Sequence, residues 1–181
     1  LTNLNQQLSA GERVIITGAN GAGKTTLLRT IAGQLPPLAG QARLGASVRL
    51  GYLSQEQELL DPAQTPLQTI QNAAPLDQTE ARSFLHHFLF TGDDPLRPIA
   101  QLSFGERSRL SLALLVASGC NFLLLDEPIN HLDIPSRTLF EQALSQFEGA
   151  VLAVVHDRYF IERYASVVWV VENGRLQVVL Q

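Results

Sequence analysis

The sequence predicts an α/β fold in which a mostly parallel sheet is flanked by helices. Patterns typical of strands and of helices alternate along most of the chain, as expected for parallel strands joined by helical crossovers. Residues 122–125 form a continuous apolar run, typical of a central strand buried on both faces. A glycine-rich segment at residues 18–26 joins a strand pattern to a helical pattern. Together these three observations predict the parallel core.

The glycine-rich segment has the pattern G-x-x-x-x-G-K-T and follows an apolar strand at residues 14–16. Its residues are Gly18, Ala19, Asn20, Gly21, Ala22, Gly23, Lys24, Thr25 and Thr26. Glycines allow a tight turn in which successive backbone N–H groups point at an anion. The lysine adds a mobile positive charge, and the hydroxyl of Thr25 is a ligand suited to Mg²⁺. The segment therefore predicts a phosphate loop at a helix N-terminus.

The helix that follows this loop is expected to run to about Ala32 and to stop at Gly33. Two short β candidates come next, at residues 41–44 and 48–53. The second strand places Gln55 just past its end.

The character of the chain changes after residue 60, where five prolines divide short helical patterns. Residues 78–90 form one such pattern, and Ser103 is the expected N-cap of an apolar helix that continues to Ser118. We interpret this part as a helical subdomain.

The predicted domain organisation is a single domain over residues 1–181. Its α/β core comprises residues 1–60 and 119–181, and its helical subdomain comprises about residues 61–118.

Two carboxylates, Asp126 and Glu127, follow the buried strand at residues 122–125. In a sheet with a phosphate loop, an acid at the end of a neighbouring strand coordinates Mg²⁺ and a further acid can polarise the attacking water. The phosphate loop and these two acids together predict a nucleoside triphosphatase.

The C-terminal part continues the alternation of helices and strands. A helix is expected from Pro135 to about residue 147, a buried strand at residues 151–155 ending at His156, and a helix at residues 158–164. Apolar runs at residues 167–171 and 176–180 flank Asn173-Gly174, a strong hairpin signal that predicts an antiparallel edge to the sheet.

Composition restricts the class of protein and its compartment. The 181 residues include 45% hydrophobic and 17% charged residues, which argues against disorder, and a single cysteine, which argues against a disulfide scaffold. No apolar run approaches the roughly 18 residues of a membrane span, and residues 1–10 are too polar for a signal peptide. The net charge of −4 gives no general attraction to nucleic acid, but a local basic patch or a partner domain could supply one, so composition leaves RNA binding open. We expect a cytoplasmic protein with no direct membrane insertion.

Six motifs in order resemble those of the ATP-binding cassette (ABC) ATPases, over nearly the whole chain. They are the phosphate loop at residues 18–26, Gln55 as the Q-loop glutamine, the signature at residues 102–106, the strand ending in Asp126 and Glu127, Asp133 in the D-loop, and His156 as the switch histidine. The resemblance implies a P-loop fold with a helical signature subdomain. It also implies N-terminal antiparallel strands, which we expect to be truncated because the chain has no methionine and begins within an element at Leu1.

The resemblance implies ATP and Mg²⁺ as cofactors and assigns roles to individual residues. Thr25, Gln55 and Asp126 would bind the metal, while Glu127, His156, Gln55 and Lys24 would act in catalysis. Residues 18–26 and the group Ser103, Gly105, Glu106 and Asp133 would contact nucleotide. In the family, the signature faces the nucleotide of a second ABC domain in a head-to-tail pair, so one copy of this chain would hold half of each site.

Two strings narrow the resemblance to the ABC-F subfamily of twin-domain ATPases. They are Asn-His-Leu-Asp at residues 130–133 and His-Asp-Arg-Tyr-Phe at residues 156–160. The resemblance implies a role at the ribosome, in translation or antibiotic resistance, and the absence of a charged arm before residue 102 favours the second domain of the pair. The alternative is the motor subunit of an ABC transporter, with a transmembrane permease as partner. A third interpretation is a DNA-repair or chromosome-associated ABC ATPase. It is disfavoured because those proteins carry long coiled coils and residues 1–181 hold none.

Overall fold

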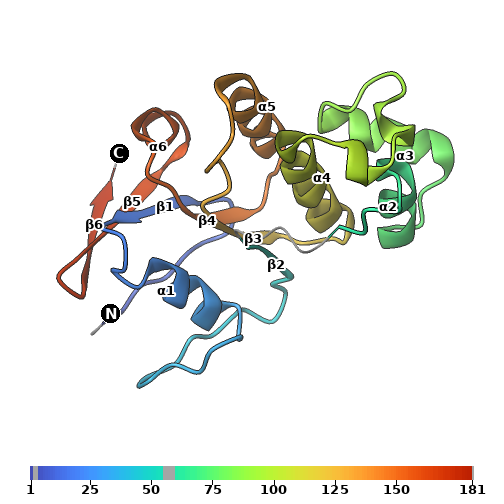
Figure 1. Cartoon of the computed structure of the whole chain (residues 1–181). Helices are drawn as coiled ribbons and strands as arrows, with labels where there is room; N and C mark the ends of the chain where they lie inside the picture. The colour runs from blue at the N-terminus through green and yellow to red at the C-terminus, as the bar shows by residue number, and fades with distance from the viewer. Residues whose placement is uncertain (2–3, 55–59, 181) are drawn as a thin grey trace. The chain divides into compact units, whose positions relative to one another are not determined.

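The computed structural model describes residues 1, 4–54 and 60–180, and within them six strands form one sheet (Figure 1). The strands are β1 (Arg13–Gly18), β2 (Leu50–Leu53), β3 (Phe122–Asp126), β4 (Ala150–Val154), β5 (Val167–Glu172) and β6 (Arg175–Leu180). Their spatial order is β2-β3-β4-β1-β5-β6, and all neighbours are parallel except β5 and β6. The α/β fold with a mostly parallel sheet is confirmed.

The antiparallel edge is a two-residue hairpin. Asn173 and Gly174 connect β5 to β6 with φ angles of 50° and 75°. Positive φ at both central residues is the geometry of a type I′ turn, which asparagine and glycine adopt readily. The hairpin expected from the Asn-Gly pair is therefore confirmed.

The chain divides into two compact units. The sheet unit comprises residues 1–55, 121–128 and 149–181, and the helical unit comprises residues 56–120 and 129–148. The expected core included residues 129–148, whereas in the structure this segment clusters with the helical unit. The physical reason is that its helix packs against the long helix of that unit.

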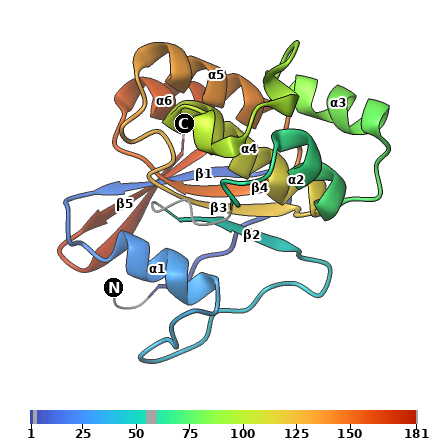
Figure 2. The same ribbon diagram turned by 45° about the vertical axis from the view of Figure 1, so that its right-hand side comes forward.

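Within the sheet unit, helices cover both faces of the sheet. The helix α1 (Lys24–Ile31) lies on one face and α6 (Arg158–Tyr164) on the other, as the two views agree (Figures 1 and 2). Alternate strand residues point to opposite faces, so Val14, Leu124 and Leu152 share a core cluster with Leu28 of α1. β3 and β4 are buried at every position, as expected of central parallel strands.

The helical unit begins its helices with well-formed N-caps. It contains α2 (Pro66–Ala73), α3 (Gln78–His87), the short 3₁₀ turns Asp94–Leu96 and Ile99–Gln101, α4 (Phe104–Ala117) and α5 (Ile134–Ser145). Thr65, Asp77 and Ser103 each form a capping box with the residue three positions later. Two otherwise unpaired backbone N–H groups are satisfied at each of these helix starts. The Ser103 N-cap was expected from the sequence.

One predicted strand is wrong. Residues 41–44 adopt no regular structure and are exposed, and the described part of the chain offers them no partner strand. A strand needs a neighbour for its backbone groups and a face to bury, and Leu44 keeps 45% of its surface exposed. The second candidate, residues 48–53, contains the observed β2.

The longest helix among the described residues is α4, with 14 residues. A membrane-spanning helix needs about 20 residues that are mostly apolar. None of the helices described reaches the length and hydrophobicity that crossing a bilayer requires.

Candidate functional site

The phosphate loop lies where β1 ends and α1 begins, at the carboxyl edge of the parallel strands. Gly18 has a φ of 144°, and a Cβ added there would lie 2.2 Å from the carbonyl oxygen of Val171 in the neighbouring strand. Gly23 has a φ of 93° and is the N-cap of α1. Both positions therefore require glycine, one for close approach to a backbone and one for a left-handed conformation.

The side chain of Lys24 folds into its own loop and is only 5% exposed. Its ammonium donates hydrogen bonds to the carbonyl oxygens of Gly18, at 2.9 Å, and Ala19, at 2.8 Å. An ammonium carries three N–H donors, so these two bonds still permit a third to a phosphate oxygen. The positive charge is thus held at the centre of the loop.

The N-terminus of α1 differs from the other helix starts. Gly23 provides no side-chain cap, whereas Ser103, Asp133 and Asp157 accept hydrogen bonds from the first turns of α4, α5 and α6. The first N–H groups of α1 are therefore available to an external anion, and the helix dipole favours negative charge there.

Asp126 joins the second strand of the site to the loop. It is the last residue of β3, is 3% exposed, and its Oδ1 accepts a hydrogen bond of 3.1 Å from the hydroxyl of Thr25. Burial raises the pKa of Asp126, and the charge of the adjacent Glu127 acts in the same direction. A divalent cation beside this carboxylate would favour its ionised form.

Glu127 projects from the end of β3 in a strained conformation. Its φ is 51°, unusual for a residue other than glycine, and its N–H donates to the carbonyl oxygen of Val154 at 3.1 Å. His156, which follows β4, places Nε2 3.8 Å from Glu127 Oε1. The structure thus brings the phosphate loop, Asp126, Glu127 and His156 together in the sheet unit.

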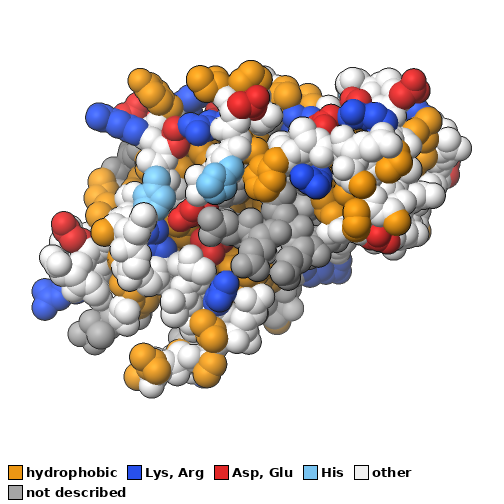
Figure 3. All heavy atoms as spheres, in the orientation of Figure 1, with side chains coloured by type: hydrophobic (Ala, Val, Ile, Leu, Met, Phe, Trp, Pro, Cys, Tyr) orange, Lys and Arg blue, Asp and Glu red, His pale blue; other side chains and the backbone are white. Residues whose placement is uncertain are grey.

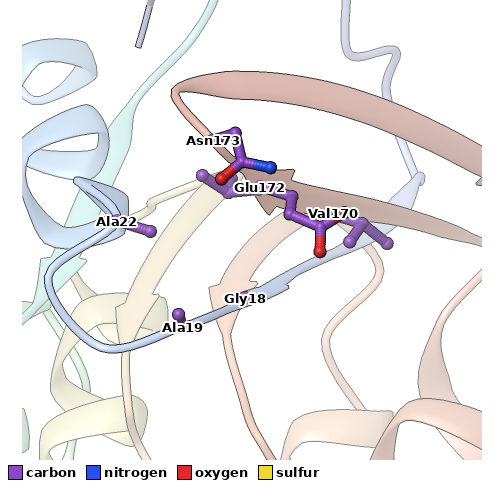
Figure 4. Close-up of a pocket in the computed structure, with 7 residues that line it drawn as sticks. Gly18, Ala19, Ala22, Val170, Glu172 and Asn173 are labelled. Atoms are coloured by element: carbon purple, nitrogen blue, oxygen red, sulfur yellow. The ribbon is translucent and has the colours of Figure 1, made fainter.

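A hollow of about 280 Å³ borders the phosphate loop on the side of the β5–β6 hairpin (Figure 4). Its lining residues are Gly18, Ala19, Ala22, Val170, Val171, Glu172 and Asn173. Figure 4 shows Ala19 and Ala22 on the loop side and Glu172 and Asn173 on the hairpin side. The hollow lies between Ala19 and Ala22 on one side and the hairpin on the other, whereas Gly18 approaches Val171 closely.

The remaining predicted site residues belong to the helical unit. Ser103 caps α4, and a Cβ added at Gly105 would lie 2.6 Å from the side chain of Ser136, so glycine allows the starts of α4 and α5 to approach closely. Asp133 caps α5 by accepting a 2.9 Å hydrogen bond from the N–H of Ser136. The side-chain hydroxyl of Ser136, and after it the N–H of Ser136, lower the pKa of the Asp133 carboxyl group.

Glu106 is held by its own unit. Its carboxylate accepts a 2.7 Å hydrogen bond from the N–H of Ser103 and forms an ion pair with Arg97, which also contacts Asp94. Burial acts to raise the pKa of Glu106, but the hydrogen bonds from Ser103 and Arg97 outweigh it and lower the pKa. The start of the signature helix is therefore stabilised by charge as well as by capping.

Gln55 lies outside the described residues. Two residues that the sequence did not single out lie close to Asp126: Tyr52 donates to its Oδ2 at 3.3 Å, and Arg29 contributes positive charge. The signal that could have revealed Tyr52 is a polar side chain in a short apolar strand that ends at the edge carrying the phosphate loop.

Basic and acidic side chains are interspersed on the face drawn in Figure 3, and the described residues form no continuous basic area there. This agrees with the net charge of −4.

A glycine-rich loop between a strand and a helix, hydrogen-bonded through its threonine to an aspartate on another strand, defines the P-loop class of ATPase domains. The model of the ABC transporter family matches residues 1–130. The chain belongs to this family.

Relatives extend the match to almost the whole chain. The Bacillus subtilis (strain 168) protein YdiF is 42% identical over 178 residues, which are 98% of this chain and 28% of YdiF. The ribosome protection protein VmlR of the same organism is 39% identical over 97% of this chain and 32% of its own length. ABC transporter F family member 5 of Arabidopsis thaliana is 39% identical over 96% of this chain and 25% of its own length. The chain is therefore an ABC ATPase domain of the ABC-F type, and it spans about 28% of the length of YdiF.

Solved structures share the fold at lower sequence identity. The dimeric ATP-binding cassette MJ0796, in a post-hydrolysis state with ADP and Pi, matches with a TM-score of 0.80 at 21% identity, covering 99% of this chain and 90% of that chain. A structure described as a metal-chelate type ABC transporter matches with a TM-score of 0.77 at 23% identity, covering 98% of this chain and 75% of that chain. Both confirm the ABC-type α/β fold.

Replacing Gly18 by alanine is expected to lower the free energy of unfolding by about 3 kcal/mol or more, because the new Cβ would collide with a backbone carbonyl of β5. Gly21→Ala is the matched control, since Gly21 has a φ of 76° but no described atom within 4 Å of the added Cβ; it should cost only about 1 kcal/mol. Urea unfolding measures both. Equal losses would show that the contact with β5 is unimportant.

Glu106→Gln is expected to make stability less sensitive to acid. The pKa of Glu106 is lowered on folding, so its contribution is present above its ordinary value of 4.5 and is lost as pH falls through the lower folded value. Glutamine keeps the capping box but not the charge. Thermal unfolding between pH 6 and pH 3 should show a smaller loss for Glu106→Gln than for the parent, with the exposed Glu148→Gln as control. An unchanged acid dependence would contradict this expectation.

Proposed function

We propose that this chain binds ATP with Mg²⁺ and hydrolyses it as one half of a head-to-tail pair of ABC domains. The observation that carries the proposal is a buried lysine and an uncapped helix N-terminus, placed beside a threonine that is hydrogen-bonded to a buried aspartate. The lysine and the helix N-terminus favour a polyphosphate, and the two oxygen ligands favour a metal that bridges to it. Residues 18–26 form the phosphate cradle.

The donor set beside the loop fits Mg²⁺. Thr25 and Asp126 offer hard oxygen ligands within 3.1 Å of each other, and Gln55 is proposed as a third. Among the described residues no group of three or more His, Cys, Asp or Glu side chains could hold a metal ion by itself. A cation here would need phosphate oxygens and water to complete its shell, which is how Mg²⁺ binds with nucleotides. When bound, it would neutralise charge on the β- and γ-phosphates.

The residues proposed for catalysis flank the position of the γ-phosphate. Lys24 would hold the β- and γ-phosphates, and Glu127 would orient and polarise the attacking water. His156, 3.8 Å from Glu127, would hold the transferred phosphoryl group, with Gln55 contacting the metal or the water. The strained φ of Glu127 supports this assignment, because such strain clusters at functional sites.

The second half of the site is proposed to come from another ABC domain, in the same protein or in a second copy. Ser103 and Gly105 lie at the start of α4, where a helix N-terminus can bind an anion, and they would face the nucleotide of that domain. Glu106 and Asp133 would support this surface as a capping residue and as part of the D-loop. The absence of a charged arm before residue 102 supports placement as the second domain.

The biological role that we propose is ATP-driven domain closure at the ribosome, in translation or antibiotic resistance, in the cytoplasm. Support comes from VmlR, a relative named as a ribosome protection protein, and from the ABC-F type of the chain. The alternative role is the motor subunit of a transporter with a permease partner. It rests on the similarity to a solved transporter structure at 23% sequence identity, which supports the fold but not the role.

Two substitutions separate nucleotide binding from turnover. Lys24→Ala should weaken binding of a fluorescent ATP analogue about 10-fold or more, because the buried positive charge is lost.

Glu127→Gln should keep binding within about 2-fold but lower phosphate release about 100-fold or more, because it removes the general base without removing a phosphate contact. Hydrolysis at the parental rate by Glu127→Gln would exclude Glu127 as the general base.

Ribosome association is tested with the full-length protein carrying Glu127→Gln, which should remain closed with ATP. We expect it to co-sediment with ribosomes in ATP and about 10-fold less in ADP, because closure requires the γ-phosphate. Lys24→Ala added to the same protein is the control and should abolish the difference. Association that does not depend on ATP would exclude the ribosomal role, and recovery with a membrane complex would favour the transporter alternative.

A further inference from the structure

The carboxylate of Asp126 is held through both of its oxygens. Thr25 donates to Oδ1 at 3.1 Å, and the hydroxyl of Tyr52 lies 3.3 Å from Oδ2. Tyr52 reaches this position from β2, which pairs with β3 so that Tyr52 lies opposite Leu124, two residues before the aspartate. The two contacts arrive from different elements, one from α1 and one from the edge strand.

The direction of the Tyr52 hydrogen bond follows from its two partners. An ionised carboxylate only accepts hydrogen bonds, and a guanidinium only donates them. The hydroxyl of Tyr52 interacts with Asp126 and with the side chain of Arg29, which lies one helical turn after Thr25 on α1. The hydroxyl therefore donates to Asp126 and its proton points at Oδ2, and the guanidinium of Arg29, which can only donate, favours this orientation.

A carboxylate that is fixed at both oxygens cannot rotate freely about its terminal torsion, which is otherwise broad. The contact with Thr25 alone would leave Oδ2 able to swing away from the loop. With the Tyr52 hydroxyl in place, Oδ1 stays beside the hydroxyl of Thr25, and the two proposed metal ligands keep their relative position. Groups that orient a metal ligand in this way contribute to metal affinity without touching the metal.

We propose that Tyr52, oriented by Arg29, is a positioning residue that presents Asp126 to Mg²⁺ in the nucleotide complex. This inference rests on the proposed function, because it assumes that the metal binds between Thr25, Asp126 and the phosphates. The Tyr52 hydroxyl acts through the carboxylate. The ring of Tyr52 contributes to packing, so the hydroxyl can be tested separately from the ring.

Tyr52→Phe in the full-length protein removes the hydroxyl and keeps the ring. The measurement is the affinity for a fluorescent ATP analogue, first in EDTA and then as MgCl₂ is titrated in. Only the part of the fluorescence change that Lys24→Ala abolishes is assigned to this site. We expect the affinity in EDTA to stay within about 2-fold of the parent. The Mg²⁺ concentration at the midpoint should rise about 3- to 10-fold, because one orienting hydrogen bond to the metal ligand is lost.

A matched control and a second variant separate positioning from packing. Tyr159→Phe removes the hydroxyl of a tyrosine in α6 that is 78% exposed and should leave both measurements unchanged. Arg29→Lys keeps the positive charge but loses the planar donor, so it should raise the Mg²⁺ midpoint in the same direction as Tyr52→Phe. In the double variant of Tyr52→Phe and Arg29→Lys, the second substitution should not raise the Mg²⁺ midpoint further, because its effect passes through the hydroxyl.

A second measurement uses Mn²⁺ in place of Mg²⁺. The electron paramagnetic resonance spectrum of bound Mn²⁺ should broaden in Tyr52→Phe and not in Tyr159→Phe.

The outcomes distinguish this inference from the function on which it rests. If the parent protein shows no Mg²⁺-dependent nucleotide binding, the proposed function is wrong. If the parent binds and Tyr52→Phe has the parental Mg²⁺ midpoint, the positioning role alone is wrong. An equal loss of affinity in EDTA and in Mg²⁺ would make Tyr52 a packing residue and would also overturn the inference. If Tyr52→Phe fails to fold, Arg29→Lys decides, and an unchanged midpoint there refutes the role.

Discussion

The hydrogen bond between Thr25 and Asp126 is the interaction on which the rest of the site depends. It joins the first turn of α1 to the end of β3, although β4 lies between β1 and β3 in the sheet. The contact is possible because parallel strands end at the same edge, so the loop after β1 and the carboxylate after β3 meet there. The close approach of Gly18 to β5 fixes the loop from its other side.

The helices α1 and α4 begin in different ways. In the helical unit, α4 is capped by Ser103 and Glu106, and Arg97 neutralises the added charge. In the sheet unit, α1 begins at Gly23 without a side-chain cap, and a buried lysine stands beside it. The capping box satisfies two backbone N–H groups at the start of α4, whereas no side chain caps the first N–H groups of α1. This contrast supports α1 as the place where nucleotide binds.

Most of the fold could be predicted from sequence patterns that involve only residues close together along the chain. The Asn173-Gly174 hairpin, the Ser103 cap and the buried strand at residues 122–125 each depend on residues that are neighbours along the chain. Residues 41–44 were predicted as a short strand, but a strand forms only with a partner. The placement of α5 with the helical unit likewise depended on the close approach of Gly105 to Ser136.

The sequence by itself determined the phosphate loop, the acids after β3 and the family resemblance, because these are patterns of residue type at fixed spacing. Only the tertiary structure decided that Tyr52 and Arg29 reach Asp126 and that Glu106 is paired with Arg97. These contacts join side chains from different elements, whose directions follow from strand register and helix packing. No spacing along the chain encodes them.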